Sequence, residues 1–261
     1  MSPSRVYFGP FDRPQWYAGG MNLMAAVLLA ALVPAPAAPE YVALGDSYAA
    51  GVGTDRASCG RTAKAYPALF AEGRYDLEFK ACAGATTQDV ARQAEALSPS
   101  TALVTVTVGG NDAGFAEVMT ACVLSDDRAC EGQVAKAERF IRDELPGRLE
   151  GLFGSMRSQT DAQVVVLGYP RLFEQSDPCS LSGPKRAAVN RASDALADVL
   201  GAQATAFSFT FVDVRGRFAG HGACGGSPWV NDLTLPVTSS YHVNTAGHRD
   251  GYLPALREVA P

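Results

Sequence analysis

The chain has 261 residues, of which 47% are hydrophobic and 19% are charged, so it can fill a core and is not intrinsically disordered. That length suits one large domain or two small ones. The net charge is −5 and the sequence contains no basic block, which argues against a nucleic-acid partner.

The first forty residues resemble a segment that is removed during export. An apolar run over residues 23–33 is followed by Ala35-Pro36-Ala37, an A-x-A cleavage pattern. This pattern predicts a signal peptide over residues 1–37, with translation beginning at Met1 or at Met21. A buried helix is the alternative, but core helices seldom end in so much proline and alanine. A transmembrane helix would need about 20 apolar residues, so we expect a secreted protein with no stable membrane anchor.

Residues 38–261 alternate strand-like and helix-like segments without a linker, so we expect a single domain there. Runs rich in β-branched or aromatic residues predict strands at 41–44, 77–81, 103–108, 164–167 and 207–214. Helical periodicity covers 87–97, 133–153, 185–200 and 245–257. Thr86 or Thr87 is the expected N-cap of the first helix, and Pro146 should kink or split the second. This alternation predicts a three-layer α/β/α domain with a five-stranded parallel sheet.

Three turns after the first three strands carry residues suited to acyl transfer. They are Gly45-Asp46-Ser47-Tyr48, Cys82-Ala83-Gly84 and Gly109-Gly110-Asn111-Asp112. The carboxyl ends of parallel strands meet at one rim, so the three turns should converge. Ser47 is then a candidate nucleophile. The backbone N–H groups of Ser47 and Gly84 and the side-chain amide of Asn111 are candidate oxyanion donors.

Each of these residues also has a purely structural interpretation. Ser47 suits a helix N-cap, and Asn111 suits a turn after two glycines. We expect Asp46 and Asp112 to hold their turns through side-chain to backbone hydrogen bonds, with no part in proton transfer.

The three turns resemble the first three sequence blocks of the GDSL, or SGNH, hydrolases. The segment Ser240-Tyr241-His242-Val243-Asn244 is similar to the histidine segment of secreted actinobacterial lipases in that family, and the likeness runs from residue 40 to the end of the chain. The resemblance implies a flavodoxin-like α/β/α fold and hydrolysis of carboxylic esters. It also implies Ser47 as nucleophile and Gly84 and Asn111 as oxyanion donors.

Two histidines six residues apart, His242 and His248, compete for the role of base. Most members of the family have an aspartate three residues before the histidine, but positions 239 and 245 here are serine and threonine. The resemblance to the actinobacterial lipases favours His242, with the backbone carbonyl of Ser240 accepting its Nδ1–H. We expect His248 to face solvent. Asp232 or Asp250 is the alternative group to orient the ring.

The six cysteines follow the predicted signal peptide and contain no C-x-x-C pair, which predicts disulfides and no zinc or redox site. Six cysteines allow 15 pairings. We expect sequential pairing because it closes local loops: Cys59–Cys82, Cys122–Cys130 and Cys179–Cys224. No metal and no cofactor is expected.

The long loop 215–241 bears on the substrate. Its apolar residues are expected either to line an acyl pocket beside Ser47 or to form a small core under the loop: Phe218, Trp229, Val230, Leu233, Leu235 and Val237. Residues 220–225 match G-x-G-x-x-G but open no evident helix, so they indicate no nucleotide site, and His221 is expected in a loop at the pocket wall.

We expect a monomeric secreted esterase or lipase that acts on lipid-like or aryl esters. The alternatives are a carbohydrate acetylesterase and a secreted binding protein with a vestigial site. Sugar sites usually present exposed aromatic platforms, and Trp229 is the one tryptophan after the predicted cleavage position.

Overall fold

The computed structural model describes residue 9 and residues 37–55, 57–176 and 178–260. The predicted signal peptide lies outside these residues apart from Gly9 and Ala37, and its boundary stays a prediction. The segment from Ala37 onward forms one unit by the density of its internal contacts.

A single parallel sheet runs through the described residues, with strand order β2-β1-β3-β4-β5. The strands are β1 (Glu40–Gly45), β2 (Asp76–Phe79), β3 (Thr101–Thr107), β4 (Gln163–Leu167) and β5 (Thr210–Val212). Val42, Val104 and Val165 in the central strands are fully buried, as their nearly continuous apolar sequences require. The five-stranded parallel sheet predicted from the sequence is confirmed.

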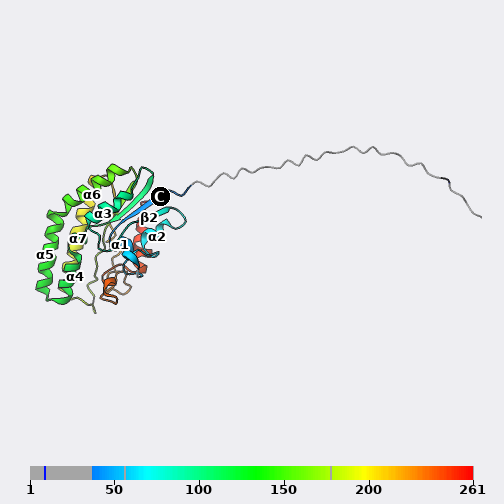
Figure 1. The fold of residues 1–261 in the computed structure, drawn as a ribbon. Helices are drawn as coiled ribbons and strands as arrows, with labels where there is room; N and C mark the ends of the chain where they lie inside the picture. Colours follow the sequence, from blue (N-terminus) through cyan, green and yellow to red (C-terminus); the bar gives the residue numbers. More distant parts are fainter. Residues whose placement is uncertain (1–8, 10–36, 56, 177, 261) are drawn as a thin grey trace, which may run out of the picture. The chain divides into compact units, whose positions relative to one another are not determined.

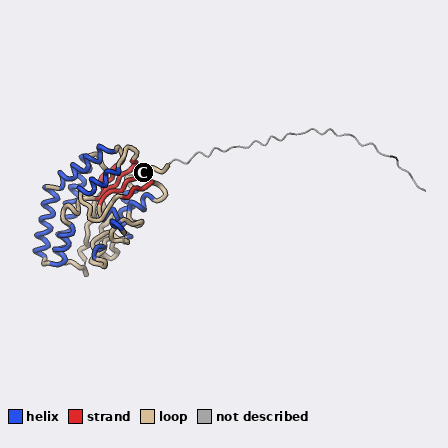
Figure 2. The backbone as a smooth tube through the Cα atoms, viewed as in Figure 1, coloured by secondary structure: helices blue, strands red, loops and turns tan. Residues whose placement is uncertain are grey.

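Helices cover both faces of this sheet. They are α1 (Ser47–Ala50), α2 (Tyr66–Ala71), α3 (Thr87–Gln93), α4 (Phe115–Leu124), α5 (Asp127–Asp143), α6 (Leu145–Gln159), α7 (Gly183–Ala206) and α8 (Leu253–Arg257). Figure 1 shows α3, α5, α6 and α7 together on one side of the strands, and Figure 2 shows the same layers by colour. On the other side α2 packs against α8. None of the helices in the described ranges is long and apolar enough to cross a bilayer.

Short helical turns complete the secondary structure. Three are 3₁₀ turns and one is a π-helix: η1 (Ser58–Gly60), η2 (Ala94–Ala96), η3 (Val237–Ser239) and η4 (Gly247–Tyr252).

The elements differ from the predicted ones in several places. The predicted helix 133–153 is two helices, because α5 ends at Asp143 and Pro146 lies in the first turn of α6, where its missing N–H costs nothing. The sequence analysis missed the short helices α1 and α2, and it also missed α4, whose apolar residues show no clear one-faced pattern. Strand β5 is shorter than predicted, because α7 extends to Ala206 and Phe207 caps it.

The topology places a crevice where the predicted chemistry lies. From β1 the chain crosses to β2 at the edge, and it returns to β3 on the opposite side of β1. The connections that follow β1 and β3 therefore leave in opposite directions, and such a switch point is where open α/β sheets bind ligands.

Three disulfides link Cys59 to Cys82, Cys122 to Cys130, and Cys179 to Cys224. This is the sequential pairing expected from the sequence. The first bond joins the segment after α1 to the turn that carries Gly84. The third joins the segment before α7 to the long loop 215–241.

Candidate active site

Ser47 lies at the sharp turn where β1 ends. Gly45 has φ of 129°, and a Cβ there would come within 2.4 Å of the Thr107 carbonyl oxygen, so the turn requires glycine. Asp46 accepts a hydrogen bond from the Tyr48 N–H at 2.9 Å and is the N-cap of α1. Ser47 is therefore not the N-cap, and its hydroxyl is available for another partner.

That partner is His242. Its Nε2 lies 2.9 Å from the Ser47 Oγ, and its Nδ1 lies 2.9 Å from the Ser240 carbonyl oxygen. A carbonyl only accepts, so Nδ1 carries the proton and Nε2 accepts from the serine hydroxyl. This is the tautomer that a general base needs. Asp232 instead accepts from Ser180, and Asp250 pairs with its neighbour Arg249.

Burial keeps this imidazole neutral. Desolvation lowers the pKa of His242 to about 4, although the bond to the Ser240 carbonyl acts in the opposite direction. At neutral pH the ring is therefore free to take up a proton.

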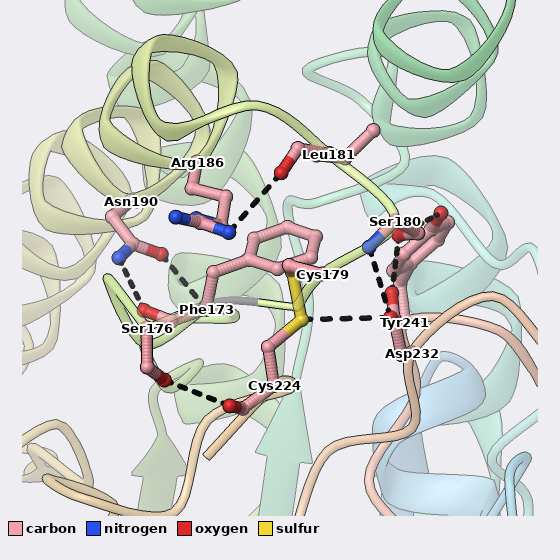
Figure 3. The surroundings of a disulfide bond; sticks show 10 residues. All are labelled: Phe173, Ser176, Cys179, Ser180, Leu181, Arg186, Asn190, Cys224, Asp232 and Tyr241. Carbon is pink, nitrogen blue, oxygen red and sulfur yellow. Dashed lines mark hydrogen bonds between the residues drawn. A yellow bond between two sulfur atoms is a disulfide. The ribbon is translucent and has the colours of Figure 1, made fainter.

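Contacts from three segments hold Tyr241 and His242 in place. The Tyr48 hydroxyl donates to the Tyr241 carbonyl at 2.6 Å, and its ring packs 5.3 Å from the ring of His242. The Asn231 N–H donates to the His242 carbonyl at 2.9 Å. Figure 3 shows a further support beside the Cys179–Cys224 bond, where Asp232 accepts from the Ser180 N–H at 3.1 Å. The Ser180 hydroxyl also contacts the hydroxyl of Tyr241.

The expected oxyanion donors line the same groove as Ser47 and His242. Gly84 has φ of 80° with open space where a Cβ would stand, which allows substrate to reach its N–H. In the described part of the chain, the N–H groups of Ser47 and Gly84 have no hydrogen-bond partner. Asn111 donates one amide hydrogen to the Ala85 carbonyl at 2.9 Å, which orients the side chain and leaves its second hydrogen available.

Both acidic neighbours accept side-chain to backbone hydrogen bonds, as expected, but Asp112 binds a different turn from its own. Asp46 caps α1 as described. Asp112 accepts from the Thr87 N–H at 2.8 Å and from its hydroxyl at 2.7 Å, so it ties the third turn to the start of α3 rather than to itself.

The expectation that His248 faces solvent is wrong. Its side chain is fully buried in η4, its Nδ1 accepts from the Tyr66 N–H at 3.2 Å, and its ring stacks near those of Tyr66 and Tyr252. The π-helix η4 packs against α2, and this contact takes His248 away from solvent. Within the described residues, no hydrogen bond joins His248 to Ser47 or His242.

Two hollows meet at Ser47. One is an open groove of about 600 Å³, bordered by α4 and by residues 233–242. The other is a cavity of about 70 Å³ with nearly all apolar walls, between α4, α5 and α7. Both are lined by Ser47, Asn111 and Phe115.

Among the apolar residues of loop 215–241, two line the groove and two are buried, whereas Leu235 takes neither expected role because it is 87% exposed and lines neither hollow. Leu233 and Val237 line the open groove and are partly exposed. Phe218 and Val230 are buried, and Phe218 packs against Tyr252 with ring centres 5.3 Å apart. The expectation that His221 stands at the pocket wall is wrong: it stacks on Trp229 at 3.8 Å, and neither residue lines a hollow at Ser47.

Comparison with known proteins identifies the family. The model of the GDSL-like lipase/acylhydrolase family matches residues 43–249. The chain belongs to this family. It is therefore a carboxylic ester hydrolase, and its fold matches those of the similar solved structures.

Similar proteins come from Streptomyces. Lipase 1 of Streptomyces coelicolor is 44% identical over 254 residues, which cover 93% of this chain and 94% of that protein. The crystal structure of an extracellular lipase from Streptomyces rimosus is 44% identical, with a TM-score of 0.82, and covers 85% of this chain and all of that one. A phospholipase A1 from Streptomyces albidoflavus is 42% identical with a TM-score of 0.83, over 86% of this chain and all of that one.

The sequence analysis missed two contributors to this rim. One is the apolar cavity, whose walls come from three helices that no local motif connects. The other is Tyr169, which lies two residues after the end of β4 on the same rim as the three predicted turns.

Proposed function

We propose that this member of the family hydrolyses carboxylic esters through an acyl-enzyme on Ser47, with His242 as general base and then general acid. The observation that carries the proposal is the pair of 2.9 Å contacts through His242, to Ser47 on one side and to Ser240 on the other. The Ser47 and Gly84 N–H groups and the Asn111 amide supply the oxyanion donors.

The acylation step follows from these positions. The Ser47 oxygen bonds to the ester carbonyl carbon while its proton passes to Nε2 of His242. The carbonyl electron pair moves onto the oxygen, where the three donors hold the negative charge. When the pair returns, the bond to the alcohol oxygen breaks, and that oxygen takes the proton from Nε2. The products are the free alcohol and an ester of Ser47.

Deacylation repeats the sequence with water. Nε2 takes a proton as the water oxygen bonds to the acyl carbon, and the same donors hold the second oxyanion. The bond to the Ser47 oxygen then breaks, the serine recovers its proton, and the carboxylic acid leaves. Throughout, the Ser240 carbonyl stabilises the ring that carries protons on both nitrogens.

The two hollows suggest where the two arms of the ester lie. The 70 Å³ cavity is narrow and apolar, which suits an unbranched acyl chain. The 600 Å³ groove is wide enough for the alcohol part, with Leu233 and Val237 at its edge. A chain longer than acetyl is needed to fill the narrow cavity, which favours lipid-like or simple aliphatic esters over sugar acetates.

We also propose that the protein is exported. The apolar segment and the cleavage pattern in residues 23–37 support this, as do the three disulfides, which persist in oxidising compartments. One similar protein is named an extracellular lipase.

A comparison of residues 38–261 with the Ser47→Ala variant, both assayed on p-nitrophenyl butyrate, tests the function. We expect the variant to lose at least about 10³-fold in kcat, because removal of the nucleophile leaves only the oxyanion donors and substrate binding. Equal rates in the two proteins would refute the acyl-enzyme and favour a binding protein with a vestigial site.

A further inference from the structure

A fourth strand end contributes to the rim that holds Ser47. Strand β4 ends at Leu167, and Tyr169 follows two residues later with its side chain almost wholly buried. Its hydroxyl donates a hydrogen bond to Oδ2 of Asp46 and accepts one from the Gly110 N–H at 3.2 Å. Asp46 directly precedes Ser47 in the chain, and Gly110 directly precedes Asn111.

We propose that Tyr169 is a positioning residue that fixes the nucleophile Ser47 relative to the oxyanion donor Asn111. The inference rests on the proposed function of these two residues and adds a residue that does not itself touch the substrate. One oxygen atom bridges the turn after β1 and the turn after β3, so neither turn can shift alone without breaking a bond to it.

The hydroxyl is needed because both of its partners lie in a closely packed region. Asp46 is only 1% exposed, and its two oxygens accept from the Tyr48 N–H and from Tyr169. Burial raises the pKa of Asp46 to about 7, while the bond from Tyr169 lowers it. Without the hydroxyl, Oδ2 of Asp46 and the Gly110 N–H would both lose their partner, and buried polar groups without a partner are costly.

The ring of Tyr169 extends this support to the base. It packs edge-on against Tyr48, with ring centres 5.0 Å apart and an interplanar angle of 75°. The ring of Tyr48 in turn packs on His242, and its hydroxyl donates to the backbone carbonyl of Tyr241, the residue before His242. One buried side chain therefore contacts the supports of the nucleophile, of an oxyanion donor and of the histidine.

The test is Tyr169→Phe, which removes the bridging oxygen and keeps the ring. The matched control is Tyr41→Phe, since Tyr41 is also fully buried and bonds one hydroxyl, that of Thr105 at 2.6 Å, at the opposite end of β1. On p-nitrophenyl butyrate we expect Tyr169→Phe to lower kcat about 10- to 100-fold with KM changed less than about twofold, because a small misplacement of reacting groups acts on the transition state. Tyr41→Phe should keep both constants while losing a similar amount of thermal stability.

A double-mutant cycle is the second test. Asp46→Asn alters the same bond from its other end, and it replaces Tyr169→Phe as the test if that variant does not fold. If the two side chains act through one bond, the double variant should lower kcat no further than the more damaging single variant.

Three results would overturn the inference: a kcat for Tyr169→Phe equal to that of Tyr41→Phe, a loss confined to KM, or independent effects in the cycle. These differ from a failure of the proposed function, in which the unaltered protein would be no more active than Ser47→Ala.

Discussion

A larger side chain in the wall of the narrow cavity should reduce the length of the longest acyl chain that the enzyme accepts. Ala192 in α7 lines this cavity, and Ala192→Leu extends the side chain into it while keeping a residue that favours helix. One water-sized group needs at least about 10–15 Å³, so the cavity of about 70 Å³ has room for about five methylene-sized groups. The unaltered enzyme should therefore take acyl chains up to about hexanoyl.

The size of the effect follows from the methylene groups that are buried. Each contributes about 0.8 kcal/mol, or about fourfold in kcat/KM. From butyrate to hexanoate the unaltered enzyme should gain about 15-fold in kcat/KM, since two methylenes enter the apolar cavity. In Ala192→Leu the added carbons occupy that space, so this gain should vanish, whereas the value for acetate should change little.

The assay is kcat/KM for p-nitrophenyl acetate, butyrate, hexanoate and octanoate. Ala187→Leu is the matched control, because Ala187 is an exposed residue of the same helix that lines neither hollow. If Ala192→Leu keeps the chain-length profile of Ala187→Leu, the acyl chain does not enter this cavity, and the assignment of the two arms of the ester is wrong.

Three further outcomes are expected. Because burial lowers the pKa of His242 to about 4, kcat/KM should fall on the acid side of a pH–rate profile with a midpoint near 4. A midpoint near 6.5 would contradict a buried base. A midpoint near 7 that vanishes in Asp46→Asn would assign the titration to the Asp46 carboxyl. His242→Ala should abolish ester hydrolysis, whereas His248→Ala should lower the melting temperature and leave kcat in the folded protein largely intact; loss of kcat in the second variant alone would reverse the assignment. Replacing both cysteines of Cys179–Cys224, which lie 45 residues apart, by serine should reduce the free energy of unfolding by about 4 kcal/mol. The same change at Cys122–Cys130, which lie 8 residues apart, should reduce it by about 2.5 kcal/mol. The reverse order in urea titrations would refute the loop-entropy estimate.

The sheet was predictable because its strands are buried on both faces. In the sequence, such strands are short runs of valine, leucine and aromatic residues. The ends of β1, β3 and β4 lie within two residues of their predicted positions. Helix α4 was not predictable in the same way, because apolar residues also lie on its exposed side, where Ala116 and Leu124 face solvent. Periodicity reveals a helix only when apolar and polar residues separate onto different faces.

The candidate site was predictable to the extent that it consists of strand-end turns. Ser47, Gly84 and Asn111 could be placed on one rim from the order of strands alone, and all three do line one groove. His248 could not be placed, because its burial depends on how η4 packs against α2, far away in the sequence. A polar residue in a C-terminal helix gives no sign of such packing.

Tyr169 shows most clearly why the remainder could not be predicted. Strand β3 lies between β1 and β4, so the side chains of Tyr169 and Asp46 must together bridge two strand spacings, about 9–10 Å. Tyr169 passes over the turn after β3, where its hydroxyl accepts a hydrogen bond from the Gly110 N–H at 3.2 Å. The sequence analysis interpreted Gly109-Gly110 only as a turn. The structure gives this turn another role, since its backbone N–H binds the tyrosine that joins the two turns on which the proposed chemistry depends.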